Sequence, residues 1–256
     1  MYKELYRYYN TYGTYNSGKI FSDNQHFLHY NLERYDIFEL LKKQGPQIIV
    51  YALRGPFESQ IEAQELIVDY AQKTKARIVF LSSANVFDAF SHFPSYEFDK
   101  TLSESIYGKL KIRCENLLMR NLPENQYAIC RLPMVFGTGS PRVEEVRNLA
   151  FQDAAIEVFP HLIINATTIK KLTQQVHYII NRKKYGIFHL GSNNLIHHKE
   201  FIYELVKGFR LVHKPIYKNV YTSNFDRYLA VLPKDNKLPK HLQITNEEVL
   251  EGCTKL

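Results

Sequence analysis

Three apolar, strand-like runs separated by helical segments constrain the fold of this chain more than any other feature of its sequence. The runs are Gln47–Leu53, Arg77–Leu81 and Gln126–Leu132. Between them lie Ser59–Lys73 and a segment that begins at Ser103 or Ser105, both with apolar residues at helical spacing. Strands that alternate with helices form a mostly parallel sheet covered on both faces. The sequence therefore predicts an α/β fold with a doubly wound parallel sheet.

The rest of the chain divides by the regularity of this pattern. Thr11–Tyr15 and Phe27–Tyr30 read as two further short strands before the first clear one. After residue 137 the alternation loosens, although helical spacing returns in Thr168–Arg182 and roughly His198–Val212. We therefore expect a sheet domain in residues 1–137 and a smaller lobe in residues 138–256.

A tyrosine and a lysine share one face of the helix that begins near Ser103. Tyr107 and Lys111 are four residues apart, so they lie one helical turn from each other. A nearby ammonium favours the phenolate form of a tyrosine, which lets the phenol give or take a proton closer to neutral pH. The pair therefore suits reversible carbonyl–alcohol chemistry.

Spacing alone is weak evidence, because the 19 tyrosines give four Tyr-x-x-x-Lys matches, among them Tyr203/Lys207. Only Tyr107/Lys111 follows a strand that ends in hydroxyls, at Ser82 and Ser83. Side chains at the carboxyl ends of parallel strands face the crevice where open α/β sheets bind ligands. Ser83, Tyr107 and Lys111 are therefore the candidate catalytic set.

Composition narrows the class of protein. The 256 residues carry a net charge of +7 at pH 7, and the pI is about 9.1, but there is no long block of basic residues, so we do not expect a nucleic-acid partner. The three cysteines form no paired framework, which favours a reducing, cytoplasmic location. No apolar run reaches the length of a membrane span, and no histidine spacing predicts a metal site.

Several ordered motifs together resemble the extended short-chain dehydrogenase/reductases, and most closely their dTDP-4-dehydrorhamnose reductase branch. The run Gly45–Ala52 is similar to the family's proline-led fourth strand, and Phe80–Phe87 resembles its Ser-Thr-Asp-Tyr-Val-Phe signature. Tyr107–Lys111 matches the Tyr-Gly-x-x-Lys helix, and Arg131–Gly137 matches the segment after the sixth strand. The resemblance implies a Rossmann-like domain in residues 1–137, a substrate-binding lobe in residues 138–256, and NAD or NADP as cofactor.

The resemblance also implies roles for the matched positions. Tyr107 would be the proton donor or acceptor, Lys111 would bind the nicotinamide ribose, and Ser83 would hold the reacting oxygen. The implied cofactor contacts, besides Tyr107 and Lys111, are Asn31, Leu32, Ala52, Leu53, Arg54 and Ser82. The implied substrate contacts, besides Ser83, are Asn85, Val135 and Asn165. For Ala52 and Leu53, plain strand packing is an equally good explanation.

Two departures from the family pattern bear on function. The family's Asp-Tyr pair after the hydroxyl is Ala84-Asn85 here, and none of the 11 glycines forms the G-x-G-x-x-G turn. That turn places backbone N–H groups against the cofactor pyrophosphate. The first strand of the sheet is also not evident, so we expect a family member shortened at its N-terminus, with open strand edges and weak dinucleotide binding.

Two classes of function stay open at this point. The first is an NAD(P)-dependent reductase or epimerase that acts on a nucleotide-linked sugar. The second is a non-catalytic sugar- or nucleotide-binding regulatory relative, or an inactive truncated product. The resemblance is compatible with a homodimer and gives no reason to expect a membrane partner. The loop Asp88–Thr101 has the size of a lid and is expected to be mobile without ligand.

Overall fold

The computed structural model describes residues 1–89 and 91–254, which form two compact units interleaved along the chain. The first unit comprises Met1–Leu81, Leu110–Ile129 and Val176–Gly186, and the second comprises Ser82–Lys109, Cys130–Gln175 and the residues from Ile187 onward. This division differs from the single boundary expected at residue 137. The reason is that the chain passes from one unit to the other within three strands of the main sheet, at residues 81–82, 129–130 and 186–187.

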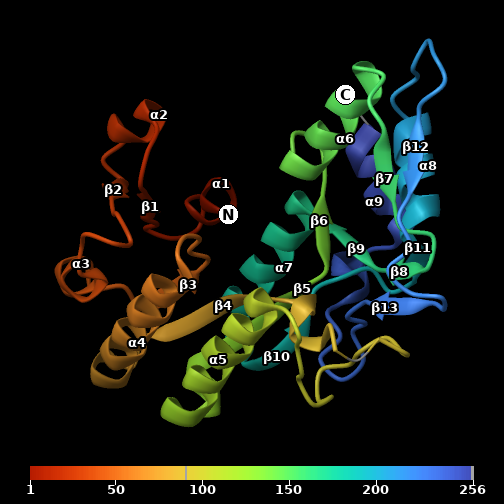
Figure 1. Ribbon diagram of the computed structural model, residues 1–256. Helices are drawn as coiled ribbons and strands as arrows, with labels where there is room; N and C mark the ends of the chain where they lie inside the picture. The colour runs from red at the N-terminus through yellow and green to blue at the C-terminus, as the bar shows by residue number, and fades with distance from the viewer. Residues whose placement is uncertain (90, 255–256) are drawn as a thin grey trace. The chain divides into compact units, whose positions relative to one another are not determined.

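The elements before residue 88 alternate between strands and helices (Figure 1). They are α1 (Tyr2–Leu5), β1 (Gly13–Tyr15), α2 (Lys19–Ser22), β2 (Phe27–His29), α3 (Ile37–Gln44), β3 (Ile48–Tyr51), α4 (Phe57–Thr74), β4 (Arg77–Ser83) and the 3-10 helix η1 (Ala84–Phe87). Local chemistry sets several of these ends. Asp36 caps α3 by accepting the Phe38 N–H at 2.7 Å, and Gly45, with φ of 61°, ends it.

The remaining elements follow the same pattern and then become short. They are α5 (Ile106–Asn121), η2 (Glu124–Gln126), β5 (Tyr127–Leu132), β6 (Met134–Phe136), α6 (Pro141–Phe151), β7 (Ile156–Val158), β8 (Leu162–Ile164), β9 (Ala166–Thr168), α7 (Ile169–Asn181), β10 (Gly186–His189), β11 (Ile196–His197), α8 (His198–Lys207), β12 (Tyr217–Asn219), β13 (Arg227–Leu229), η3 (Lys240–Leu242) and α9 (Asn246–Thr254). None of the helices within residues 1–89 and 91–254 has the length and hydropathy of a membrane-spanning segment.

The main sheet has four strands in the order β10-β5-β4-β3, and β3 pairs with β4 in parallel. Ile78, Val79 and Phe80 of β4 are almost completely buried, as expected for a strand that is covered on both faces. The helices α4 and α5 lie side by side (Figure 1), and Gln64 of α4 donates to the Cys114 carbonyl oxygen of α5 at 2.8 Å. The predicted α/β class with parallel pairing is confirmed.

The two strands nearest the N-terminus stand apart from the main sheet. β1 and β2 pair in parallel as a separate two-stranded sheet, from Gly13 opposite Phe27 to Tyr15 opposite His29. β3 lies at the end of the four-stranded order, so among the described residues neither β1 nor β3 has a second strand partner. A doubly wound sheet places its first strand between these two edges, and the expectation that this strand is missing stays a prediction.

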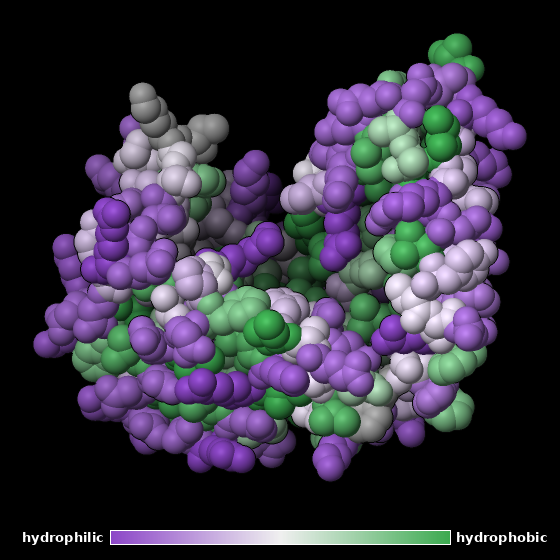
Figure 2. Space-filling view, in the orientation of Figure 1, coloured by the Kyte–Doolittle hydropathy of each residue, from purple (hydrophilic) through white to green (hydrophobic). Residues whose placement is uncertain are grey.

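The second unit is built on three small sheets, β11-β8-β13, β12-β7 and β6-β9. Its core contains Phe136 and Phe201, whose rings are 4.6 Å apart, together with Val143 of α6, Ile164 of β8 and Val249 of α9. On the face drawn in Figure 2, hydrophilic side chains are mixed with scattered apolar ones, as on most folded proteins.

The loop expected to be a lid is anchored in the second unit. Ser95 forms an isolated parallel bridge with Val231, and its N–H donates to the Ala230 carbonyl oxygen at 2.9 Å. The Glu97 carboxylate is completely buried and accepts the N–H groups of residues 234–236 at 3.1–3.4 Å. Hydrogen bonds at Ser95 and Glu97 therefore anchor the middle of the loop, and its mobility without ligand stays a prediction.

Candidate active site

The helix α5 presents Tyr107 in its first turn and Lys111 one turn later. Leu110, Cys114 and Leu118, spaced four residues apart, form a buried row along the helix within the first unit. The Tyr107 side chain stays 40% exposed, so its phenol is accessible to a ligand. Tyr107 therefore lies at the partly exposed start of the helix.

Lys111 lies in the first unit and is only 5% exposed. Its Nζ donates to the Leu81 carbonyl oxygen at 3.2 Å and lies 4.8 Å from the centre of the Phe80 ring. Burial lowers the pKa of Lys111, while Cys114 and Glu115 act in the opposite direction. The ammonium is therefore held at the carboxyl end of β4, as its predicted role requires.

Ser83 is the last residue of β4, and its hydroxyl is oriented by the residue after next. Ser83 Oγ donates to Asn85 Oδ1 at 3.0 Å and accepts the Asn85 N–H at 3.2 Å. Ser83 and Asn85 are both partly exposed, and Ser82 is buried. The strand end thus presents a hydroxyl and an amide next to each other.

Gly108 brings the Tyr107 segment against the Ser83 segment within the second unit. A Cβ atom at Gly108 would overlap the Asn85 backbone oxygen and the Ser103 hydroxyl, so only glycine allows this approach. The residue next to Tyr107 therefore touches the residue that orients Ser83. Within the second unit the segments that carry Ser83, Asn85 and Tyr107 therefore lie close together, and their catalytic role stays a prediction.

Sequence reasoning missed Asp88, which joins the same two segments. Its carboxylate accepts the Glu104 N–H at 2.7 Å and the Ser105 hydroxyl, and Ser105 in turn accepts the Gly108 N–H at 3.0 Å. An acidic residue after Val86-Phe87 carries no local signal of this role, because its partners lie 16 and 17 residues further along the chain.

The predicted cofactor residues of the first unit lie at the carboxyl ends of β2 and β3. The Leu32 side chain fills the space beside Gly55, where a Cβ atom would lie 2.8 Å from Leu32 Cδ2. Asn31 donates to Asn16 Oδ1 at 2.9 Å and accepts the Glu33 N–H at 3.0 Å. The segments 31–32 and 52–54 are thus brought together, with Ala52 and Arg54 exposed and Leu53 half-buried.

The predicted substrate residues Val135 and Asn165 of the second unit differ in burial and in hydrogen bonding. Val135 is half-buried in β6, opposite Thr167 of β9. Asn165 is completely buried, and its amide donates to the carbonyl oxygens of Ser192 and Val231 and accepts the Val231 N–H, at 2.8–3.0 Å. The Asn165 side chain therefore holds three segments of the chain together, and its contact with substrate stays a prediction.

Arg131, Glu97 and His189 form a buried cluster of polar side chains in the second unit. Arg131 Nη1 donates to the Glu97 carbonyl oxygen at 2.9 Å and lies 3.5 Å from His189 Nε2. Burial, with the charge of Arg131 as a smaller cause, lowers the pKa of His189 to about 3. The imidazole is therefore neutral in the native protein and serves as a structural group rather than an acid or base.

The comparisons with known proteins decide the family. The model of the RmlD substrate binding domain matches residues 57–237, well over half of the 256 residues. The chain belongs to this family. Membership in the RmlD family confirms the resemblance expected from the sequence motifs.

Solved structures share the fold of this RmlD-family chain at low sequence identity. A dTDP-4-dehydrorhamnose reductase from Clostridium acetobutylicum is 20% identical, with a TM-score of 0.71 over 88% of this chain and 89% of that chain. The same enzyme from Bacillus anthracis, in complex with NADP, is 19% identical, with a TM-score of 0.71 over 88% of each chain.

A third structure widens the group of relatives that share the RmlD-family fold. A dTDP-glucose 4,6-dehydratase from Bacillus anthracis, in complex with NAD, is 13% identical, with a TM-score of 0.78 over 98% of this chain and 90% of that chain. A search of curated proteins finds no match. The likeness to these structures establishes the common fold.

Proposed function

We propose that this chain is an NAD(P)-dependent oxidoreductase or epimerase that acts on a nucleotide-linked sugar, with Tyr107 as the group that gives or takes the proton. The observation that carries the proposal is the accessible Tyr107 in the first turn of α5, directly beside the residues that orient Ser83. Relatives of the same fold include dTDP-4-dehydrorhamnose reductases and a dTDP-glucose dehydratase, some in complex with NADP or NAD.

The residues present fit a nicotinamide dinucleotide at several points. Segments 31–32 and 52–54 meet at the carboxyl ends of β2 and β3, where open α/β sheets bind ligands. The buried ammonium of Lys111, at the Leu81 carbonyl oxygen near the end of β4, fits a ribose hydroxyl group, and Ser82 follows Leu81 in the same strand. When bound, the dinucleotide supplies or accepts the hydride.

The protein's own residues then handle the proton and the orientation of the substrate. The Ser83 hydroxyl turns from Asn85 Oδ1 to donate to the reacting sugar oxygen, while the Asn85 N–H continues to donate to Ser83 Oγ. Tyr107 donates a proton to that oxygen in reduction and takes it back in oxidation. The charge of Lys111, one turn along α5, stabilises the phenolate form of Tyr107.

The direct test follows nicotinamide absorbance with a panel of nucleotide sugars. Tyr107→Phe removes the acid/base group and is expected to lower kcat by about 10²–10⁴-fold while the affinity for nucleotide is kept. Tyr203→Phe is the matched control, because Tyr203 also lies on a helix with a lysine, Lys207, four residues later. Near-normal turnover in a folded Tyr107→Phe protein contradicts the assignment.

A non-catalytic binding protein is the second candidate. It is favoured by the lack of a G-x-G-x-x-G turn in the sequence and by the position of β3 at the end of its sheet. A regulatory relative binds nucleotide or nucleotide sugar without any change in nicotinamide absorbance. Calorimetric binding of the sugars that give no turnover with either NADH or NADPH identifies this case.

A further inference from the structure

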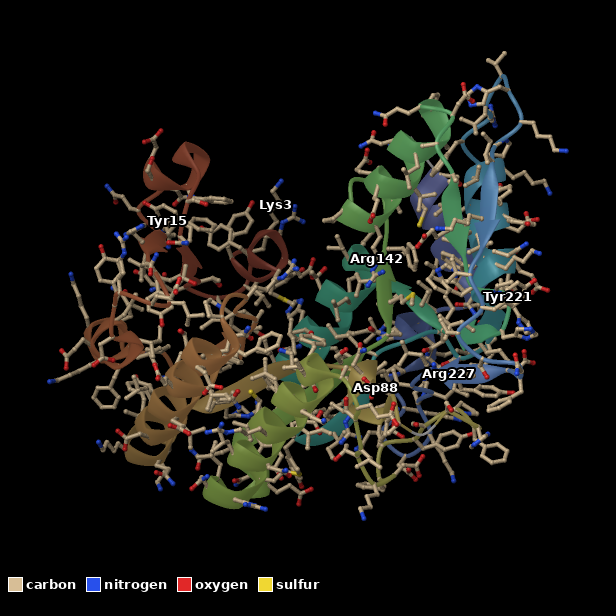
Figure 3. The ribbon with its side chains drawn as sticks, viewed as in Figure 1. Lys3, Tyr15, Asp88, Arg142, Tyr221 and Arg227 are labelled. Carbon is tan, nitrogen blue, oxygen red and sulfur yellow. The ribbon has the colours of Figure 1, made fainter. Side chains whose placement is uncertain are left out.

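The carboxylate of Asp88 lies between the two segments that carry Ser83 and Tyr107. Asp88 follows η1 directly, and its N–H donates to the Asn85 carbonyl oxygen at 3.3 Å. Figure 3 places Asp88 beside the first turn of α5. On one side, therefore, Asp88 is bonded to Asn85, which is the residue that orients the Ser83 hydroxyl.

On the other side, Asp88 holds the start of α5 by two hydrogen bonds. One carboxylate oxygen accepts the Glu104 N–H at 2.7 Å, and the other accepts the Ser105 hydroxyl. Ser105 Oγ accepts the Gly108 N–H at 3.0 Å, and the Ser105 carbonyl oxygen accepts the Lys109 N–H at 3.0 Å. Ser105 thus caps the helix, and Asp88 fixes the cap.

The charge state of Asp88 supports this arrangement. Burial alone would raise the pKa of Asp88, but hydrogen bonds from Ser105, the Glu104 N–H and Ser103 outweigh it, so that the pKa lies below its ordinary value. The group is ionised at neutral pH and accepts hydrogen bonds with both oxygens. A negative charge at this end of α5 also interacts favourably with the helix dipole.

We propose that Asp88 is a positioning residue, which sets the orientation of Tyr107 relative to Ser83 by fixing the first turn of α5 against η1. The proposal rests on the proposed function, in which Tyr107 and Ser83 act on the same substrate atom. A simple capping role would stabilise the helix end without any effect on turnover. A positioning role changes turnover through Tyr107 in particular.

The test uses Asp88→Asn, which keeps the size of the side chain and replaces one acceptor oxygen by a donor group. Asp99→Asn is the matched control, because Asp99 lies in the same loop and accepts a local backbone hydrogen bond, from the Tyr96 N–H at 2.8 Å. A small misplacement of a catalytic group costs up to about 100-fold in rate. We expect kcat to fall roughly 10- to 100-fold in Asp88→Asn, with KM within about twofold of the unmodified protein.

A double variant separates positioning from a separate catalytic contribution. If Asp88 acts through Tyr107, the protein with both Asp88→Asn and Tyr107→Phe is no slower than the one with Tyr107→Phe alone. Rate losses that multiply in the double variant overturn the proposal. So does an Asp88→Asn protein whose kcat equals that of Asp99→Asn.

Hydrogen exchange gives a readout that does not depend on turnover. Peptides that cover residues 103–109 are expected to take up deuterium faster in Asp88→Asn than in Asp99→Asn, because the Glu104 and Gly108 amides lose their protection. If the unmodified protein shows no turnover, the proposed function fails, while unchanged exchange in Asp88→Asn overturns the link between Asp88 and α5. Where Asp88→Asn does not fold, Ser105→Ala removes the same link and is judged by the same measurements.

Discussion

Acidification from pH 7.5 to 5 is expected to destabilise this protein strongly, because two buried histidines of the second unit must stay neutral. His189 donates from Nδ1 to the Leu232 carbonyl oxygen at 3.1 Å, and its Nε2 faces Arg131 Nη1, which is a donor. His198 accepts the Phe159 N–H with Nδ1 at 3.3 Å. A proton added to either ring therefore meets a hydrogen-bond donor.

The pKa values give the size and the sign of the effect. Burial, with smaller effects of Arg131 and Arg142, lowers the pKa of His189 to about 3 and that of His198 to about 4, from an ordinary value of 6.5. At a pH between these lowered pKa values and 6.5, the two histidines are protonated in the unfolded chain but neutral in the folded protein. The free energy of unfolding is therefore highest above pH 6.5 and decreases as the pH falls.

Below pH 6.5, each histidine lowers the free energy of unfolding by ~1.4 kcal/mol per pH unit. Over the roughly 1.5 units down to pH 5 this amounts to about 2 kcal/mol per histidine. The two histidines together cost roughly 4 kcal/mol, a large share of the ~5–15 kcal/mol that stabilises a typical domain.

Urea unfolding at pH 7.5, 6.5, 5.5 and 5.0 measures the effect, and two substitutions isolate it. His189→Gln keeps a donor and an acceptor, and His198→Asn keeps the acceptor for Phe159, while neither side chain titrates. The double variant is expected to be less stable at pH 7.5 but to lose ~4 kcal/mol less on acidification. His92→Gln replaces an exposed histidine and is the control. Parallel curves for the unmodified protein and the double variant refute the reasoning.

Two further substitutions test the close contacts of the second unit. Gly108→Ala forces a Cβ atom into the Asn85 backbone oxygen, so we expect a loss of about 1–3 kcal/mol in unfolding free energy and a fall in turnover; unchanged stability and rate would show that α5 is not held this closely. Glu97→Gln weakens the acceptor for the N–H groups of residues 234–236 and should cost about 1–3 kcal/mol in urea unfolding, whereas the exposed Glu58→Gln should cost nothing. Equal stability of these two variants would contradict the anchoring of the loop.

The sequence predicted the helices and strands in which apolar residues form a long run or recur at regular spacing. The strand expected at Arg77–Leu81 is β4, Arg77–Ser83, and the helix expected at Ser59–Lys73 is α4, Phe57–Thr74. Short strands were predicted unevenly: β1 and β2 were expected, but β8 and β13 were missed, because a run of three residues shows little alternation. Their pairing, Leu162 opposite Arg227, depends on a segment far along the chain.

The site was predictable where chemistry follows local spacing and unpredictable where it follows tertiary contact. Tyr107, Lys111 and Ser83 stand at positions that a helix turn and a strand end define. The burial of Glu97 depends on backbone N–H groups of residues 234–236, and the role of Asn165 depends on Ser192 and Val231. The sequence around Glu97 and around Asn165 does not indicate these partners, because they lie far along the chain.

The interleaving of the two units has a consequence for the order in which the protein can fold during synthesis. The first unit needs Val176–Gly186 as well as Met1–Leu81, so it stays incomplete until the ribosome has made residues 82–186. At roughly 5–20 residues per second this takes about 5–20 s. During the first part of that interval α4, with the buried Ile67 and Ala71, lacks its neighbour α5. The nascent chain therefore exposes apolar surface for seconds, long enough for chaperones to bind it.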